Sequence, residues 1–134
     1  SRGLGDVYKR QVLLDTPCSG SGSWRRSPAN KWQLTREKLK KNIERQTKII
    51  DTASKLVKPG GRLIYSTCSV LRRENEQQIE RFLKDNKNFD IFPIPHLWNS
   101  VLGGNCPTTD PYLNLTPAKH YTDGFFCAVL ERMS

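Results

Sequence analysis

The sequence predicts an α/β fold whose doubly wound sheet is incomplete. Segments with strand and helix patterns alternate along the 134 residues in the order strand, helix, strand, helix, strand, and this alternation is typical of sheets covered by helices. A parallel strand pair joined by a helix crosses over with a right hand. We expect an incomplete sheet because the first apolar run begins abruptly at Val12 and leaves a hydrophobic edge without cover. A second complete domain does not fit in this length.

The first strand is predicted at residues 12–15, and a loop rich in Gly, Ser and Pro follows it. The next helix begins with Thr35 as its N-cap and ends before Pro59-Gly60-Gly61. Its inward face carries apolar residues at near-helical spacing: Leu39, Ile43, Ile50, Ala53 and Val57. Another face carries cations three or four positions apart, which fit a solvated surface as well as direct contact with RNA: Lys38, Lys41, Arg45 and Lys48.

The second half of the chain continues the alternation. Residues 62–67 are partly β-branched and aromatic and predict the second strand. A helix over residues 72–85 and a short strand over residues 89–92 follow. Residues 93–123 contain five prolines and few periodic apolar positions, so we expect an irregular stretch there. Residues 124–130 supply a last buried strand.

The composition indicates a chain that meets a polyanion. The formal net charge is +9, and the excess is +11 over residues 1–75 against −2 over residues 76–134. Clustered cations gain affinity for a phosphate backbone by releasing its counterions, and an anionic membrane surface is the weaker alternative. No apolar run approaches the roughly 18 residues that span a bilayer. The four cysteines form no C-x-x-C pair, so we expect no metal site, no disulfide scaffold and a reducing cytoplasm.

Residues 1–11 have no clear helical or strand period. They resemble translated sequencing-adapter read-through, so we expect a non-native leader followed by one domain over residues 12–134. The alternative is that residues 6–8 begin the strand that continues at Val12.

Two cysteines follow the ends of predicted strands, where ligands bind in open α/β sheets. Cys18 comes three residues after Asp15, and Cys68 ends the second strand. If these strands are parallel neighbours about 4.8 Å apart, both thiols and the Asp15 carboxylate can face one small planar substrate. Both thiols adjoin hydroxyl-rich turns whose backbone N–H groups stabilise a thiolate. Cys127 lies in an apolar run and is interpreted as a packing residue.

These residues also carry a family resemblance. Residues 15–22, D-T-P-C-S-G-S-G, match the signature D-[AT]-P-C-S-G-x-G, and residues 66–69, S-T-C-S, match [SA]-T-C-S. Both signatures belong to the RNA cytosine-5 methyltransferases of the RsmB/Nop2/Sun family, which the chain resembles from about Val12 to its C-terminus, especially the bacterial 16S ribosomal RNA enzymes. K-P-G-G-R at 58–62, E-N-E at 74–76 and H-x-x-D-G-F-F at 120–126 fall in the family's order.

The resemblance implies a fold, a cofactor and residue roles. The fold is the C-terminal half of a Rossmann-like class I methyltransferase, and the cofactor is S-adenosylmethionine. Cys68 is the nucleophile that adds to carbon 6 of cytosine, and Cys18 assists release of the product. Asp15 lies between cofactor and base, and Pro17 stiffens the loop on the cofactor side. The family's Gly-rich cofactor turn precedes the first signature, and this sequence contains none, so we expect little activity from the chain alone.

The residues after the first signature also predict an RNA partner, and the family resemblance implies that this RNA is ribosomal. Arg25, Arg26 and Lys31 are predicted to contact RNA phosphates. Trp24 and Trp32 fit either stacking on an exposed base or ordinary packing. We expect a monomer. The resemblance suggests a structural role for His120 and Asp123 at the entry of the last strand, and we assign no catalysis to them.

Three alternatives remain open at this point. DNA cytosine-5 methyltransferases carry their nucleophile in a Pro-Cys dipeptide like Pro17-Cys18, which would exchange the roles of the two cysteines. The chain could instead be a catalytically silent RNA-binding module that keeps the sheet and the basic face. A thiol oxidoreductase using Cys18 and Cys68 would form a reversible disulfide, although such enzymes ordinarily carry a C-x-x-C motif.

Overall fold

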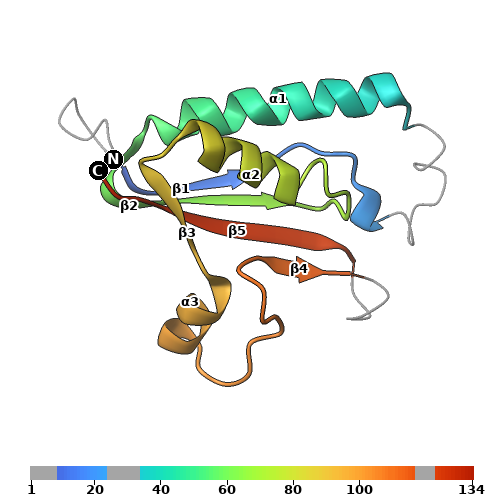
Figure 1. Cartoon of the computed structure of the whole chain (residues 1–134). Helices are drawn as coiled ribbons and strands as arrows, with labels where there is room; N and C mark the ends of the chain where they lie inside the picture. The colour runs from blue at the N-terminus through green and yellow to red at the C-terminus, as the bar shows by residue number, and fades with distance from the viewer. Residues whose placement is uncertain (1–8, 24–33, 117–122) are drawn as a thin grey trace.

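The computed structural model describes residues 9–23, 34–116 and 123–134, and it is a mixed sheet with helices on both faces. The elements in chain order are β1 (Lys9–Asp15), the 3-10 turn η2 (Ser21–Ser23), α1 (Arg36–Ser54), β2 (Val57–Thr67), α2 (Glu76–Asp85), β3 (Phe89–Phe92), α3 (Ile94–Val101), β4 (Leu113–Leu115) and β5 (Phe125–Arg132). Helices α1 and α2 lie over one face, and α3 lies on the other side of the sheet (Figure 1).

The strand order is β1-β2-β5-β3, with β4 also paired to β5. Strands β1 and β2 are parallel, as predicted, with α1 as the connecting helix. Strand β5 is antiparallel to both β2 and β3 and lies between them. The last strand of the sequence therefore enters the middle of the sheet, and β1 forms one edge of the described sheet.

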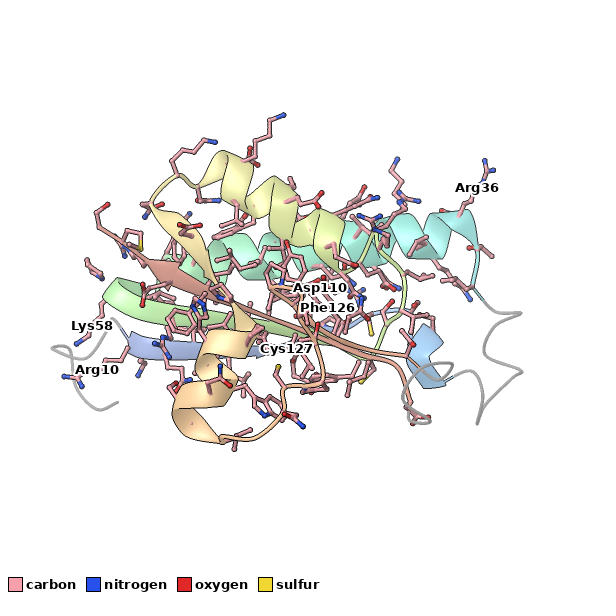
Figure 2. The ribbon with its side chains drawn as sticks, turned by 60° about the horizontal axis from the view of Figure 1, so that its bottom comes forward. Arg10, Arg36, Lys58, Asp110, Phe126 and Cys127 are labelled. Carbon is pink, nitrogen blue, oxygen red and sulfur yellow. The ribbon has the colours of Figure 1, made fainter. Side chains whose placement is uncertain are left out.

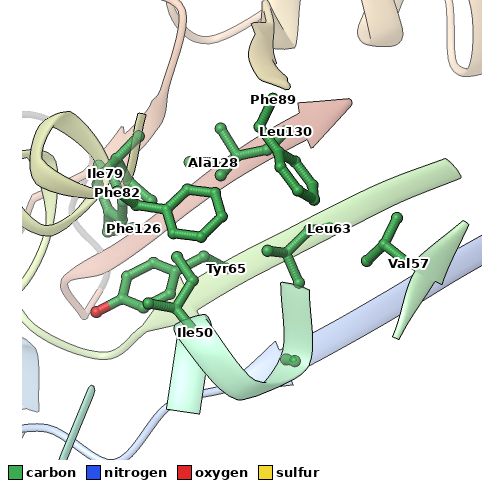
Figure 3. Packing of buried hydrophobic residues seen from close by; sticks show 11 residues of the cluster. Ile50, Val57, Leu63, Tyr65, Ile79, Phe82, Phe89, Phe126, Ala128 and Leu130 are labelled. Carbon is green, nitrogen blue, oxygen red and sulfur yellow. The ribbon is translucent and has the colours of Figure 1, made fainter. Parts of the chain in front are cut away.

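The core lies between the sheet and the helices α1 and α2 (Figure 3). Alternate residues of β2 and β5 face it, because successive side chains of a strand point to opposite faces: Leu63 and Tyr65 from β2, and Phe126, Ala128 and Leu130 from β5. Ile50 of α1 and the Ile79 and Phe82 side chains of α2 close the core from above. None of the helices in the described part of the chain is long and apolar enough to cross a bilayer.

The order of strands and helices is confirmed, and several boundaries are corrected. Strand β1 begins at Lys9, because the backbone from Lys9 to Gln11 pairs with β2; the predicted start at Val12 is too late. The origin of residues 1–11 stays a prediction. Strand β2 begins at Val57 rather than at residue 62, and its pairing with β1 shifts across the Pro-Gly-Gly segment, where Gly60 has a φ of 81°.

Two segments were predicted wrongly for local reasons. Helix α2 begins at Glu76, four residues after the predicted start, because residues 72–75 form a turn held by side-chain hydrogen bonds. The stretch at residues 93–123, predicted as irregular, contains α3 and β4. Its prolines help here, since Pro93 is the N-cap of α3 and Pro95 lies in the first turn, where no N–H donor is needed.

Candidate active site

The ends of β1 and β2 bring the two cysteine loops to the same edge of the sheet. In the parallel register Asp15 pairs with Ser66, so Cys18 and Cys68 follow paired positions at short distances along the chain. The Thr16 N–H donates to the Ser66 carbonyl at 2.9 Å, and this bond continues the pairing beyond the strand end. The backbone of Cys68 lies close enough to the Cys18 thiol to lower its pKa, and the hydroxyls of the residues that follow the two cysteines, Ser19 and Ser69, are 3.5 Å apart. The structure therefore places the two cysteines side by side.

The two thiols differ in their surroundings. Cys68 is exposed, whereas Cys18 is half-buried. Burial is the main cause that raises the pKa of the Cys18 thiol, and the negative charge of Glu74 adds to it. Hydrogen bonds from the backbone N–H groups of Gly20 and Cys68 act in the opposite direction. A substrate can reach Cys68 from solvent, while Cys18 lies beneath the loop as a protonated thiol at neutral pH.

Gly22 explains the last glycine of the first signature. Its N–H donates to the Cys68 carbonyl at 2.9 Å, and its own carbonyl accepts from the Gly124 N–H at 2.8 Å. A Cβ at Gly22 would lie 2.5 Å from the carbonyl oxygens of both Cys68 and Gly124, which is closer than real contacts allow. Only glycine lets the first loop approach the second loop and the start of β5 this closely.

Glu74 is the buried centre that joins both cysteine loops. It is fully buried, and its carboxylate accepts from the Ser19 N–H at 2.8 Å and the Ser19 hydroxyl at 2.6 Å. The Ser69 hydroxyl donates to it at 2.6 Å and the Gln46 amide at 3.0 Å. Ser19 follows Cys18 and Ser69 follows Cys68 in the sequence, so one carboxylate fixes the residue after each thiol.

Further hydrogen bonds hold the Cys68 loop to the start of α2. The Thr67 hydroxyl donates to the Asn75 side-chain oxygen at 2.6 Å, and the Asn75 amide donates to the Ser69 carbonyl at 2.8 Å. The Ser21 hydroxyl accepts from the Val70 N–H at 2.9 Å and connects the two loops a second time. Glu74 and Asn75 were given no role from the sequence. Their only signal was their place in the E-N-E segment of the resemblance, because helical periodicity assigns them to an ordinary first turn.

The other predicted site residues occupy different places. Asp15 and Pro17 are exposed at the end of β1, and the Pro17 carbonyl accepts from the Gln46 amide at 2.9 Å. Arg25, Arg26 and Lys31, together with Trp24, Trp32 and His120, lie outside the described residues. Asp123 is half-buried two residues before β5.

Cys127 lies near the start of β5, where it pairs with Ser66 of the second signature (Figure 2). Its side chain lies on the face of the sheet that α3 covers, opposite the core, with Ile94 and Trp98. Burial raises the pKa of its thiol to about 11, as suits a packing residue. The cysteines are all free, and the described residues contain no group of three or more His, Cys, Asp or Glu side chains that could hold a metal ion.

Comparisons with known proteins agree on one family. The family model of the 16S rRNA methyltransferase RsmB/F matches residues 3–131. A probable ribosomal RNA small subunit methyltransferase B of Synechocystis is 38% identical over 122 residues, which are 91% of this chain and 27% of the relative. The ribosomal RNA small subunit methyltransferase B of Shewanella oneidensis is 36% identical over 126 residues, 94% of this chain and 27% of its own. The chain thus spans about a quarter of the length of these curated relatives.

Solved structures share the fold. The crystal structure of PH0851 superposes with a TM-score of 0.80 at 34% identity, covering 95% of this chain and 27% of that one. The structure of NSun6 from Pyrococcus horikoshii with SFG gives a TM-score of 0.71 at 26% identity, covering 92% and 30%. The mixed sheet with helices on both faces is therefore part of a Rossmann-like methyltransferase fold. The matched family model, which covers nearly the whole sequence, shows that the chain belongs to the 16S rRNA methyltransferase RsmB/F family.

Proposed function

We propose that the complete protein transfers a methyl group from S-adenosylmethionine to carbon 5 of a cytosine in ribosomal RNA, and that this chain carries its two catalytic cysteines. The observation that carries the proposal is the convergence of the Cys18 and Cys68 loops at the ends of two parallel strands, where the Glu74 carboxylate accepts from both Ser19 and Ser69. Membership of an rRNA methyltransferase family supports RNA methylation, and the relative NSun6 was solved with SFG, an analogue of S-adenosylmethionine.

Cys68 is assigned the nucleophilic role because its thiol is exposed to an incoming base. Its thiolate forms a bond to carbon 6, and the electron pair of the C5–C6 double bond makes carbon 5 nucleophilic. After methylation a base removes the proton from carbon 5, the C5–C6 double bond forms again, and the bond between carbon 6 and sulfur breaks. Cys18, held against the backbone of Cys68, is assigned to this release.

The described residues fit one side of a cofactor site. The Asp15 carboxylate is exposed and has no hydrogen bond or ion pair within the described ranges, so it is free to accept from a donor group of a bound molecule or from the cytosine amino group. Pro17 is exposed beside it and limits the freedom of the loop. S-adenosylmethionine, when bound, supplies an electrophilic methyl group. Asp15 and Pro17 are the residues that would contact it, and the 134-residue chain alone is expected to bind it weakly or not at all.

The exchanged assignment, with Cys18 as nucleophile, is less well supported. A half-buried thiol whose pKa is raised by burial carries less thiolate at neutral pH, and the thiolate is the reactive form. A disulfide-forming role for the pair also gains no support from the family, and both thiols are free.

Two measurements test the function. Calorimetry with S-adenosylmethionine, followed by incubation with RNA containing 5-fluorocytidine, is performed on this chain and on the complete protein recovered with its upstream coding sequence. We expect heat of binding and a covalent protein–RNA adduct for the complete protein only. RNA binding by the complete protein without cofactor binding or adduct would contradict the proposal and support a silent RNA-binding module, which the charge of the chain favours as the second candidate.

The substrate class and the setting belong to the same proposal. The names of the curated relatives support ribosomal RNA rather than transfer RNA. Because ribosomal RNA is the proposed substrate, we propose that the protein acts in the cytoplasm and as a monomer.

A further inference from the structure

A pocket of about 450 Å³ opens beside the candidate active site, between the Cys18 loop and the first half of α1. Cys18 and Ser19 form its inner wall, and Leu34 and Asn42 contribute to its sides. The remaining lining is cationic: Lys38, Lys41 and Arg45. The pocket therefore shares one wall with the proposed cytosine site.

The positive charge of this pocket is largely unpaired. Lys38 and Arg45 have no carboxylate within 4.0 Å among the residues that the structure describes. Lys41 is 3.8 Å from Glu37, but both side chains are mostly exposed, and such surface pairs contribute little. Among the described residues, no acidic side chain lines the pocket. Glu74 lies behind Ser19, where hydrogen bonds from Ser19 and other donors engage its carboxylate oxygens. Three like charges converging on one hollow favour an anion there.

The position of these cations relative to Cys18 is fixed by Gln46. Its amide donates to the Pro17 carbonyl at 2.9 Å and to Glu74 at 3.0 Å, and Gln46 is fully buried. Because Gln46 directly follows Arg45, the basic face of α1 is anchored to the Cys18 loop. Lys38 and Arg45 are seven residues apart, which is about 10 Å along a helix. This span suits a phosphate that is part of a longer phosphodiester backbone better than a free inorganic ion.

We propose that this pocket binds a backbone phosphate of the RNA next to the nucleotide that reaches the two cysteines. The proposal rests on an RNA substrate, as argued above. A phosphate and the adjoining base are joined through one sugar, so a phosphate held beside Cys18 places that base near the thiols. The pocket thereby positions the reacting strand, without reading its sequence.

The test measures binding of short RNAs by fluorescence anisotropy at several salt concentrations. The probe is a fluorescein-labelled hexanucleotide with one cytidine, compared with the same RNA in which a neutral methylphosphonate replaces the phosphate on the 5′ or 3′ side of that cytidine. A third RNA has the neutral linkage at its far end. The protein is the 134-residue chain, with Lys38→Gln and Arg45→Gln as variants. Lys40→Gln is the matched control, because Lys40 is exposed on the same helix but does not line the pocket.

In each pocket variant the slope of log affinity against log salt concentration should be shallower by about 0.7, the value for one phosphate contact with single-stranded RNA. This change corresponds to about fivefold weaker binding at 0.1 M salt. A neutral linkage beside the cytidine should weaken binding by wild type and Lys40→Gln but not further weaken Arg45→Gln, since coupled partners are not additive. The proposal would be overturned if Lys40→Gln and Arg45→Gln weakened RNA binding equally. It would also be overturned if Arg45→Gln were non-additive only with the neutral linkage at the far end of the RNA, or if the chain bound no RNA. Coupled binding by this chain, together with no adduct between the complete protein and 5-fluorocytidine RNA, would instead contradict the methylation chemistry and leave the phosphate site standing.

Discussion

Replacing Glu74 tests whether one buried carboxylate holds both cysteine loops. Glu74→Ala removes the acceptor for four hydrogen bonds, from the Ser19 N–H, the hydroxyls of Ser19 and Ser69, and the Gln46 amide. Two of these donors have other partners close by. The Gln46 amide also reaches the Pro17 carbonyl at 2.9 Å, and the Ser69 hydroxyl lies 3.1 Å from the Ser21 hydroxyl. The two donors of Ser19 are left without a comparable acceptor.

A fully buried donor left unsatisfied costs about 1–3 kcal/mol. The two Ser19 donors are part-buried, so we take about 1.5 kcal/mol for each, in the lower half of that range, and Glu74→Ala should lower the free energy of unfolding by about 3 kcal/mol. Glu74→Gln keeps the side-chain volume and one acceptor oxygen, but its NH2 group meets donors, and we expect a loss of about 1.5 kcal/mol. Domains of ordinary stability have about 5–15 kcal/mol in total. Both variants should therefore fold, with Glu74→Ala clearly weakened.

Urea unfolding followed by circular dichroism measures these losses. With a slope of about 1.5 kcal/mol per molar urea, the midpoint should fall by about 2 M for Glu74→Ala and about 1 M for Glu74→Gln. Glu80→Gln makes the same charge change at an exposed position of α2 and should stay within about 0.5 kcal/mol of wild type. Equal midpoints for wild type and Glu74→Ala, or equal losses for Glu74→Gln and Glu80→Gln, would refute the bridging role of Glu74.

Three further results are expected. Gly22→Ala should lower the urea midpoint more than Gly103→Ala. The Cβ added at Gly22 lies 2.5 Å from two backbone oxygens, whereas a Cβ at Gly103 meets open space and adds only the strain of a φ of 67°. A larger effect at Gly103 would contradict the close approach of the loops at Gly22. Iodoacetamide labelling at pH 8, read by mass spectrometry, should modify exposed Cys68 before Cys18, whose pKa is raised by burial; the reverse order would contradict the assignment of the nucleophile. Burial raises the pKa of the Cys127 thiol from 9.0 to about 11, so with rising pH the unfolded chain loses this proton before the folded chain does. The free energy of unfolding should therefore fall between about pH 9 and 11. The urea midpoint should drop less from pH 8 to pH 10 in Cys127→Ala than in wild type.

The sequence was most informative where a local pattern decides the structure. The Thr35 side chain accepts from the Lys38 N–H at 3.1 Å and caps α1 as predicted, because an N-cap involves residues only three positions apart. The parallel pairing of β1 and β2 was also predictable, since a strand, a helix and a second strand have few other arrangements. The signatures located both cysteines for the same reason, because each loop directly follows its strand.

Long-range features were not predictable from the residues alone. The insertion of β5 between β2 and β3 depends on pairings between residues far apart in the chain. The role of Glu74 depends on Ser19, 55 positions away, and Gln46, 28 positions away. The helical periodicity of the sequence assigns Glu74 only to an ordinary first turn. Glu74 becomes buried only because three separate segments of the chain meet around it. The cationic pocket is a similar case. The basic side chains of α1 line a pocket only because Gln46 anchors the helix to the Cys18 loop.

The separate roles of the Cys68 and Cys18 thiols are tested most directly by trapping the covalent protein–RNA adduct on natural cytidine. The complete protein, with Cys18→Ala or Cys68→Ala, is incubated with ribosomal RNA and S-adenosylmethionine, and the protein–RNA species are separated under denaturing conditions. Cys18→Ala should accumulate a covalent adduct that peptide mapping locates at Cys68, because attack proceeds and release is impaired; Cys68→Ala should form none. An adduct in Cys68→Ala that maps to Cys18, with none in Cys18→Ala, would contradict the assignment.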